Sequence, residues 1–427
     1  MIKIIKADGA AEKKALAQIE ARGRAVNDEV TAAVTGILRD VQQNGDAAVD
    51  RYTLKFDGAL PEKKILGRAD MEAAMQACAP DFLAALQTAA DNISDFHKRQ
   101  VQQNWFVTKA DGVMLGQRVR GLKRVGIYVP GGTAAYPSSV LMNAIPAKIA
   151  GVEEVVMVTP PSRGGTANPD ILAAAYIAGV DKIFLCGGAQ AIAAITYGTE
   201  TAPRVDKIVG PGNIFVATAK RLVFGTVDID MVAGPSEILI VADQSADPVY
   251  LAADLLSQAE HDRLASAMLV VTDEELARRT ADELDKQLSR LSRREIAAES
   301  IENYGIIIVC KDAAEAMRFA NELAPEHLEI CLEDPMQYLG MADNAGSVFL
   351  GNHSPEPLGD YFAGPNHVLP TGGTARFFSP LSVDSFVKKV SFIRYSEAAL
   401  KACGEEIITL AEHEGLTAHA NSVKVRL

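Results

Sequence analysis

The feature that most constrains the fold is a regular alternation of short β-rich runs and helical stretches from residue 124 onward. The β-rich runs of the first block are RVGIYV, VEEVVMV, DKIFLC and VDKIVG, and stretches such as PDILAAAYIAG and AQAIAAITYG between them read as helices. A second alternating block begins near residue 236 with SEILIVAD and continues through ASAMLVVTD, GIIIVC, HLEICL and GSVFLG. Strands separated by helices with short connections are typical of parallel sheets. We therefore predict an α/β fold with two Rossmann-like parallel-sheet domains.

The two ends of the chain have another pattern. The first hundred residues read as mostly helical, with apolar residues at helical spacing in DFLAALQTAADNISDFHKRQ. The segment 380–415 also reads as helical and is followed by a short tail, LTAHANSVKVRL. A helical tail after a finished α/β domain forms little core alone. We expect it to pack on the N-terminal helices or on another subunit.

Length and composition exclude several classes of protein. A chain of 427 residues is longer than one hydrophobic core usually serves. With 42 basic and 55 acidic residues the net charge is −13, so we expect neither nucleic acid nor an anionic membrane as a partner. The five cysteines form no CxxC pair, which indicates reduced thiols. Because the N-terminus lacks the apolar core of a signal peptide, we expect a cytoplasmic protein.

Three glycine-rich turns follow predicted strands of the first block. They are YVPGGTAAYPSS (128–139), CGGAQA (186–191) and GPGN (210–213), and each opens a predicted helix. Ligands of open α/β sheets bind at the carboxyl ends of strands, and a helix N-terminus favours anions such as a pyrophosphate. The GxGxxG motif is absent from the sequence, so ordinary tight turns explain these segments equally well.

A candidate metal half-site lies in a predicted helix over 246–262. Asp247 is its expected N-cap, with Pro248 in the first turn. Gln258 and His261 are three residues apart and share a face of such a helix. An oxygen donor and an imidazole at this spacing suit a divalent metal, although a polar surface face has the same pattern.

Two further segments combine imidazoles with carboxylates. Glu326 and His327 in APEHLEI stand at a predicted strand entrance, where they form either a general acid–base pair or a buried salt pair. GDYFAGPNHVLP (359–370) has two Gly and two Pro, which predict an exposed loop carrying Asp360 and His367. His419 lies in the tail, and with Gln258, His261 and Asp360 it would complete a nitrogen and oxygen shell that suits a catalytic zinc. We interpret His97, beside two basic residues, as a surface residue.

An ordered set of motifs resembles the histidinol dehydrogenase family over nearly the whole chain. The set is GIYVPGGTAAYPSSVLMNAIPAKIAGV, GPGNIFVATAK, AGPSEILI, LLSQAEHD, APEHLEI, GDYFAGPNHVLPT and LTAHANSVKVR. The resemblance implies a zinc-dependent enzyme that oxidises L-histidinol through L-histidinaldehyde to L-histidine with two NAD⁺, at the end of histidine biosynthesis. It also implies a homodimer in which the C-terminal tail reaches the partner's active site.

The resemblance also implies a role for individual residues. Zinc would be held by Gln258, His261, Asp360 and His419, and Glu326 and His327 would be the acid–base pair. Substrate contacts would be Ser236, Gln258, His261, His327, Asp360, His367, Glu414 and His419, and NAD contacts would be Tyr128, Gln190 and Asn213. The implied domains are 1–22 with 381–405 (small, helical), 23–126 with 236–380 (catalytic, with zinc and substrate), 127–235 (NAD-binding) and 406–427 (tail).

Three alternatives stay open at this point. Cys186 at a strand end could form a thiohemiacetal with the aldehyde, but its apolar setting favours attack by water. A homologous dehydrogenase of a sulfonated diol would lack the substrate imidazole and amine, so Glu414 beside His419 favours histidinol. A binding protein without catalysis is disfavoured by the complete set of candidate ligands and acid–base residues.

Overall fold

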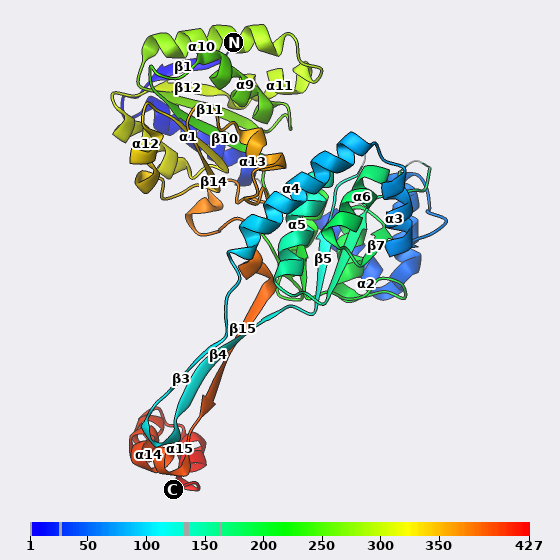
Figure 1. The fold of residues 1–427 in the computed structure, drawn as a ribbon, viewed down its shortest axis with the longest axis vertical. Helices are drawn as coiled ribbons and strands as arrows, with labels where there is room; N and C mark the ends of the chain where they lie inside the picture. Colours follow the sequence, from blue (N-terminus) through cyan, green and yellow to red (C-terminus); the bar gives the residue numbers. More distant parts are fainter. Residues whose placement is uncertain (1, 25–27, 132–135, 163) are drawn as a thin grey trace.

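The computed structural model describes residues 2–24, 28–131, 136–162 and 164–427. Figure 1 shows an upper lobe, a middle lobe and an arm that ends in two helices at the C-terminus. No helix in the described ranges combines the length and the apolarity needed to cross a bilayer. The two lobes each contain a six-stranded sheet, which confirms the prediction of two α/β units with parallel sheets.

The upper lobe is built on an all-parallel sheet. Its strands, in spatial order, are β1 (Lys3–Lys6), β12 (Ile306–Val309), β11 (Ser266–Val271), β10 (Glu237–Ala242), β13 (His327–Cys331) and β14 (Ser347–Leu350). Its helices are α1 (Ala11–Arg24), α9 (Pro248–Ala259), α10 (Glu274–Leu288), α11 (Arg294–Tyr304), α12 (Ala313–Leu323) and α13 (Glu356–Tyr361), with 3₁₀ turns at Pro335–Gln337 and Leu339–Met341. Alternate residues of β10 face opposite sides: Ile238 packs in the core with α9, α10 and α11, and Leu239 in the core with α1 and α12.

The middle lobe has the same plan, a sheet with helices packed on both of its faces. Its strands, in spatial order, are β2 (Ile65–Leu66), β7 (Lys182–Leu185), β6 (Glu154–Thr159), β5 (Arg124–Tyr128), β8 (Lys207–Val209) and β9 (Asp228–Ile229), and all pairs are parallel except that of β2 with β7. One face is covered by α3 (Arg68–Gln76), α4 (Pro80–Lys98), α5 (Pro137–Ile149) and α6 (Pro169–Ala178). The other is covered by α2 (Asp28–Asp57), α7 (Gly188–Tyr197) and α8 (Ile214–Val223).

The arm is a three-stranded antiparallel sheet in the order β15 (Val387–Arg394), β4 (Met114–Gly121) and β3 (Trp105–Thr108). At its tip lie α14 (Glu397–His413) and α15 (Thr417–Lys424). Elsewhere in the chain, short 3₁₀ turns occupy Ala110–Gly112, Thr374–Arg376 and Val383–Phe386. The helical prediction for 380–415 is therefore wrong at residues 387–394. All eight residues of β15 pair with β4, and this pairing overrides the local pattern.

The segments group differently from the expected domain boundaries. Lys3 pairs with Ile306, so β1 belongs to the upper-lobe sheet and does not join residues 381–405. The helices between residues 28 and 98 cover the middle-lobe sheet, although they were expected in one domain with 236–380. The expected border at 405/406 falls inside α14.

Candidate active site

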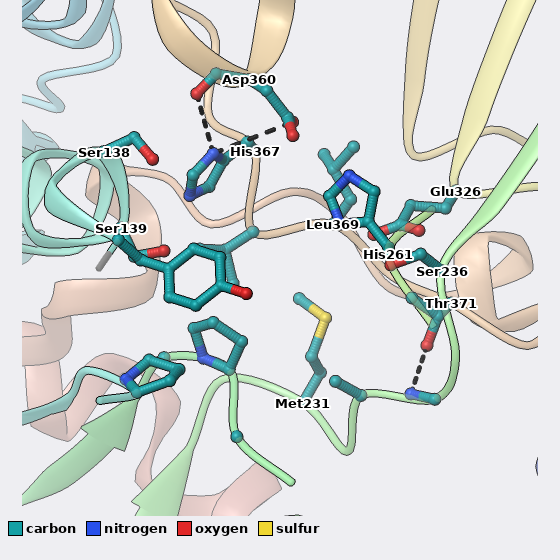
Figure 2. A pocket seen from close by; sticks show the side chains of 18 of the residues that line it. Ser138, Ser139, Met231, Ser236, His261, Glu326, Asp360, His367, Leu369 and Thr371 are labelled. Carbon is teal, nitrogen blue, oxygen red and sulfur yellow. Dashed lines mark hydrogen bonds and ion pairs between the residues drawn. The ribbon is translucent and has the colours of Figure 1, made fainter. Parts of the chain in front are cut away.

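A cavity of about 350 Å³ lies between the two lobes (Figure 2). This volume is in the range of small-molecule sites in proteins. The upper lobe and its loops supply Ser236, Gln258, His261, Glu326, His327, Asp360, Tyr361, His367, Val368, Leu369 and Thr371. The middle lobe supplies Pro130, Tyr136, Ser138, Ser139, Gly210, Pro211, Gly212, Asn213, Asp230 and Met231. The cavity therefore brings together most of the residues that the sequence singled out.

The upper-lobe sheet presents its amino edge to this cavity. Strand β10 begins at Glu237 and β13 begins at His327, so Ser236, Glu326 and His327 stand where these strands start. The predicted strand entrance for Glu326 and His327 is thus confirmed. Because adjacent residues at the beginning of a strand are not yet held in the alternating pleat, both side chains can face one cavity.

His327 is buried and has one ring nitrogen free. Its Nδ1 lies 3.0 Å from the carbonyl oxygen of Glu237, so Nδ1 carries the proton and donates to that oxygen. Among the described residues its Nε2 has no hydrogen-bond partner, and it lies 3.7 Å from Oε1 of Glu356 and 3.9 Å from Oδ1 of Asp360. Burial lowers the pKa of His327 below its usual value. The side chain is therefore a neutral imidazole whose Nε2 can accept a proton.

Glu326 is fixed beside His327. Its Oε2 accepts a hydrogen bond from the backbone N–H of Glu237 at 2.9 Å and lies 3.7 Å from Nδ1 of His327. Burial, with smaller contributions from nearby carboxylates, raises the pKa of Glu326 well above its usual range. A carboxylate with a raised pKa is a stronger base, which is the property that activation of water requires.

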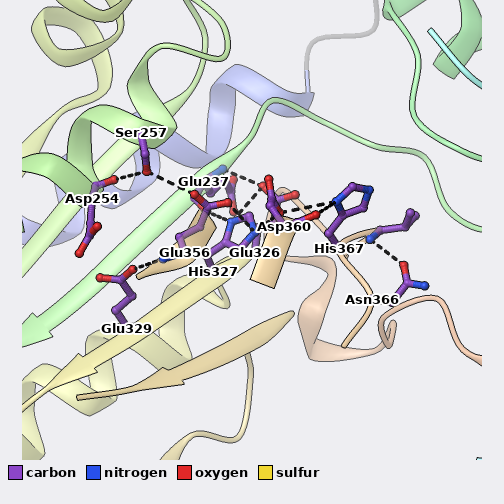
Figure 3. A network of polar contacts seen from close by, with 11 residues as sticks. Glu237, Asp254, Ser257, Glu326, His327, Glu329, Glu356, Asp360, Asn366 and His367 are labelled. Atoms are coloured by element: carbon purple, nitrogen blue, oxygen red, sulfur yellow. Dashed lines mark hydrogen bonds and ion pairs between the residues drawn. The ribbon is translucent and has the colours of Figure 1, made fainter. Parts of the chain in front are cut away.

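Glu356 is a residue of this site that the sequence reasoning missed. It is buried, and Figure 3 shows it between Ser257 and His327. Burial, followed by the neighbouring Asp360, raises the pKa of Glu356 to about 9. The signal was present in the sequence, because Glu356 and Asp360 are four residues apart and share one face of α13.

The residues present fit a divalent cation. His327, Glu356 and Asp360 place potential ligand atoms within 4.8 Å of one another. Within the described part of the chain, three buried polar atoms here have no hydrogen-bond partner, namely Oε1 of Gln258, Nε2 of His327 and Oε1 of Glu356. Such atoms are costly unless something binds them. Nitrogen and oxygen donors without a thiolate are compatible with Zn²⁺ or Mn²⁺.

Gln258 and His261 both line the cavity, but they are not on one helix face. Asp247 caps α9 as expected, since its side chain accepts from the N–H of Val249. The helix ends at Ala259, and His261 lies in the turn that follows. The prediction of a helix to 262 is wrong at this end, while the position of both side chains at one cavity agrees with a shared role.

The loop after α13 carries His367 into the cavity. Its Nδ1 donates to the backbone oxygen of Asp360 at 2.9 Å (Figure 2). Asp360 itself lies in the short helix α13, and residues 364–370 are buried or half-buried. The prediction of an exposed loop is therefore wrong except at residues 362 and 363. His97, expected on the surface, is fully buried in α4.

His419 and Glu414 do not reach the cavity of their own chain. Both are exposed at the tip of the arm, at the far end of the molecule from the two lobes (Figure 1). Within one chain, the structure therefore brings together three of the four expected zinc ligands and leaves the fourth outside.

The three expected NAD contacts occupy different places in the middle lobe. Asn213 lines the cavity and caps α8, where its side chain accepts from the N–H groups of Phe215 and Val216. Tyr128 and Gln190 are buried and do not line it; the hydroxyl of Tyr128 accepts from the N–H of Gly188 at 3.1 Å.

Two of the three glycine-rich turns reach the cavity. They are the turns around Pro130 and at 210–213, while residues 132–135 of the first turn lie outside the described part of the chain. The turn at 210–213 requires glycine at its first position, because Gly210 has φ +107° and a Cβ there would lie 2.2 Å from the backbone oxygen of Tyr128.

Cys186 is remote from this chemistry. The side chain is buried and does not line the cavity between the lobes. Burial raises the pKa of its thiol to about 12, so the nucleophilic thiolate is scarce at neutral pH. The geometry thus disfavours a thiohemiacetal on Cys186.

Comparison with known proteins agrees with these observations. The sequence profile of the family described as histidinol dehydrogenase matches residues 20–427. The histidinol dehydrogenase of Clostridium acetobutylicum is 53% identical over 426 residues, covering 100% of this chain and 99% of the relative. That of Listeria innocua is 55% identical over 400 residues, covering 94% and 93%. A crystal structure of histidinol dehydrogenase from Elizabethkingia anophelis superposes with a TM-score of 0.93 at 38% identity, covering 100% of this chain and 98% of that one. The chain therefore belongs to the histidinol dehydrogenase family of oxidoreductases.

Proposed function

We propose that this protein oxidises L-histidinol to L-histidine through L-histidinaldehyde, with zinc and two NAD⁺. The observation that carries the proposal is the acidic upper wall of the cavity. Buried polar atoms of Gln258 and His327, on this wall, and of Glu356, behind it, have no partner among the described residues. No lysine or arginine occurs among the described residues that line the cavity. Such a wall suits a metal cation and an amino alcohol better than an anionic substrate.

Gln258, His261 and Asp360 would hold the zinc from this chain. Of the converging group His327, Glu356 and Asp360, only Asp360 would be a ligand, because Nε2 of His327 is needed as the base. When bound, the ion would orient the amino alcohol, while NAD⁺ would accept the hydride. His367 would then border the substrate, because its ring is fixed on the backbone oxygen of Asp360. Ser236 lies on the same wall, at the start of β10, and would contact the substrate as well.

His327 would act as the base in both oxidations. Its proton on Nδ1 is held by the oxygen of Glu237, so Nε2 is available to take the proton of the alcohol as hydride leaves carbon. Glu326 would remove a proton from water as it adds to the aldehyde. The hydrate formed in this way is again an alcohol, and His327 would accept its proton in the second oxidation.

The carboxyl edge of the middle lobe would bind the dinucleotide. Helices α5 and α8 begin at this edge, and the positive end of each helix dipole favours the negative charge of a pyrophosphate. Asn213 would contact NAD directly. Tyr128 and Gln190 lie beneath the surface, and Tyr128 would act by holding the turn before α7 through the N–H of Gly188.

We further propose a homodimer in which the arm reaches the partner. Large apolar side chains on it are exposed in the single chain, including Trp105 at 52%, Phe106 at 62%, Ile393 at 75% and Leu410 at 68%. Exposed apolar surface of this kind marks an interface. The partner's cavity would receive His419 as the fourth zinc ligand, with Glu414 facing the imidazole of the substrate.

The second candidate is a dehydrogenase of another small polar alcohol, such as a sulfonated diol. A sulfonate needs a cationic partner, and the described cavity wall has carboxylates instead. Histidinol is therefore the preferred substrate.

The test is NAD⁺ reduction with histidinol and with a sulfonated diol, before and after removal of the metal by a chelator. We expect turnover of histidinol alone, its loss on chelation, and its return when Zn²⁺ is added. Turnover of the diol with none of histidinol would contradict the substrate assignment.

Tail exchange is tested with mixed dimers of two inactive variants, His419→Ala and His327→Asn. A mixed dimer has one complete site only if the tail serves the neighbouring cavity. Mixing the two variants and re-forming the dimers should therefore restore part of the activity. If the tail acts within its own chain, no activity should return.

A further inference from the structure

The buried histidine of the middle lobe is joined to the loop that carries the active-site residues. Nε2 of His97, in α4, lies 3.3 Å from Nδ2 of Asn366, which immediately precedes His367. The two residues are 269 positions apart in the chain, and both are buried. None of the steps assigned to Glu326, His327 or the zinc ligands uses either side chain.

The hydrogen bonds around this pair are mutually consistent. Nδ1 of His97 donates to Oε1 of Gln100 at 2.7 Å, which leaves Nε2 as the acceptor for the amide of Asn366. The same amide nitrogen donates to the backbone oxygen of Met142 at 2.6 Å, and Oδ1 of Asn366 accepts from the N–H of Val368 at 2.9 Å (Figure 3). Every polar atom of the two side chains is therefore used, and only an amide at 366 satisfies all of these partners.

The network connects three parts of the molecule. Met142 belongs to α5, the helix whose first turn lines the cavity through Ser138 and Ser139. Gln100 also accepts from the N–H of Val383, in the turn that leads into the arm. A second contact supports the first, because Nδ2 of Asn92 in α4 donates to the backbone oxygen of Phe362 in the loop.

We propose that His97 and Asn366 are positioning residues that hold the loop over 362–370, which follows Asp360 and carries His367, in register with the middle lobe. The two walls of the cavity come from different lobes, and hydride transfer needs the reacting atoms within a fraction of an ångström of their productive positions. The loop is the segment that touches both walls, and the pair fixes it on the side of the dinucleotide. This role rests on the proposed function, since it concerns the same site.

Two amide variants at position 97 distinguish loss of the hydrogen bond to Asn366 from loss of the imidazole ring itself. In His97→Gln, the side-chain oxygen falls near the position of Nε2 and can still accept from Asn366. In His97→Asn, the amide replaces Nδ1, so the bond to Gln100 is kept and the bond to Asn366 is lost. Asn366→Ser removes the donor from the other side and serves as the second variant where His97→Asn fails to fold.

The first measurement is hydrogen exchange of the backbone amides in peptides covering 362–370, which needs no turnover. We expect exchange about tenfold faster in His97→Asn and Asn366→Ser, and within about twofold of the parent in His97→Gln. Ser300→Ala is the matched control: it removes one buried hydrogen bond, from Oγ of Ser300 to the oxygen of Ala265, in a different part of the upper lobe. It should leave exchange of the loop unchanged.

The second measurement separates positioning from general destabilisation. His97→Asn should raise KM for histidinol and release zinc to a chelator more readily, by about tenfold each, with an unchanged dissociation constant for NAD⁺. Equal behaviour of the two position-97 variants, or faster unfolding with unchanged loop exchange, would overturn the proposal. If the parent enzyme does not oxidise histidinol, the proposed function fails while the exchange comparison still decides whether the pair holds the loop.

Discussion

The two lobes share one architecture but turn opposite edges of their sheets to the common cavity. The middle lobe presents the carboxyl ends of β5 and β8, as the general rule for open α/β sheets predicts. The upper lobe presents the amino ends of β10 and β13. The rule therefore holds for one lobe and is reversed in the other.

This reversal has an electrostatic consequence. At a carboxyl edge the following helices begin, so α5 and α8 direct positive partial charge toward the cavity. At an amino edge the preceding helices end, and the C-terminal turn of α9, with its negative partial charge, brings Gln258 to the site. One wall suits an anionic dinucleotide, and the other suits a metal ion and an amine.

The charged side chains follow the same division. Asp230, on the middle-lobe wall, forms a buried ion pair with Lys220. Glu326 and Asp360, on the upper wall, and Glu356, behind it, lie 3.7 to 3.9 Å from ring nitrogens of His327 or His367, and no lysine or arginine lines the described part of the cavity. The middle wall is thus neutralised internally, whereas the carboxyls of the upper wall have no lysine or arginine partner on the described cavity wall and are available to a cationic ligand.

The largest effect is expected from removing the base on the upper wall. In His327→Asn the amide can still donate to the oxygen of Glu237, but the acceptor Nε2 is lost. We predict that kcat falls by roughly 10³-fold, with zinc content and melting temperature unchanged. Steady-state NADH formation and metal analysis measure this, and a fall of less than tenfold would assign the proton to another group.

A negative charge added at Asn213, on the cavity wall formed by the middle lobe, should have an effect of intermediate size. Asn213→Asp preserves the cap of α8, because a carboxylate also accepts from the N–H groups of Phe215 and Val216. It adds a negative charge beside the proposed dinucleotide site, so we predict that KM for NAD⁺ rises about tenfold. KM for histidinol and zinc content should not change. An unchanged KM for NAD⁺ would mean that the cofactor binds elsewhere.

Asp57, a half-buried carboxyl of the middle lobe, predicts that the stability of the protein depends on pH. Burial raises its pKa from 3.8 to about 6, opposed by a hydrogen bond from the N–H of Gly187. The folded state therefore holds the proton more tightly than the unfolded state, and stability falls as the pH rises from about 4 to 6. Asp57→Asn keeps an acceptor for Gly187 and should stabilise the protein on the order of 1 kcal/mol at pH 7.5, after allowance for solvent access.

Thermal unfolding of the parent and of Asp57→Asn at two pH values tests this sign. The gain should be largest at pH 7.5, shrink as the pH falls through about 6, and be nearly lost below 3.8, the pKa of the unfolded state, where Asp57 is mostly protonated in both states. A gain that does not depend on pH would assign the effect to something other than ionisation of this carboxyl.

The smallest effect is expected at Cys186. Because its thiol is buried away from the cavity and has a raised pKa, Cys186→Ala should leave oxidation of histidinaldehyde within about twofold of the parent. Stopped-flow measurement of the second hydride transfer tests this step directly. A large loss of this step alone, with alcohol oxidation intact, would revive the thiohemiacetal route.

The inner strands of both sheets could be predicted because they are buried on both faces and read as continuous apolar runs. The short edge strands β1, β2 and β9 were missed, because they are partly exposed and have no such run. β15 could not be predicted, since nearly all of its residues are exposed and no core imposes an alternation on VKKVSFIR. His97 was misjudged from its charged neighbours in the sequence. Its helix neighbours were informative, because Leu86, Ala90, Ile93 and His97 recur at spacings of three and four and form one buried stripe.

The site was predictable residue by residue but not in its arrangement. Residue types identified Gln258, His261, Glu326, His327, Asp360 and His367, which all line one cavity. The placement of the two lobes decides which edge of each sheet faces the ligand. Local sequence patterns contain no information on this placement. The same holds for His419, whose distance from the cavity of its own chain follows from the length of the arm.

The position of β1 has a consequence for how the protein is made. Its four residues pair only with β12, so Lys3 must wait for Ile306 to leave the ribosome. All strands of the middle lobe lie between residues 65 and 229, and this lobe can close while the upper sheet is still incomplete. The first strand to be synthesised is thus held back by the entropy of closing a loop of about 300 of the 427 residues. An emerging chain should protect the middle lobe from protease first and the N-terminus late.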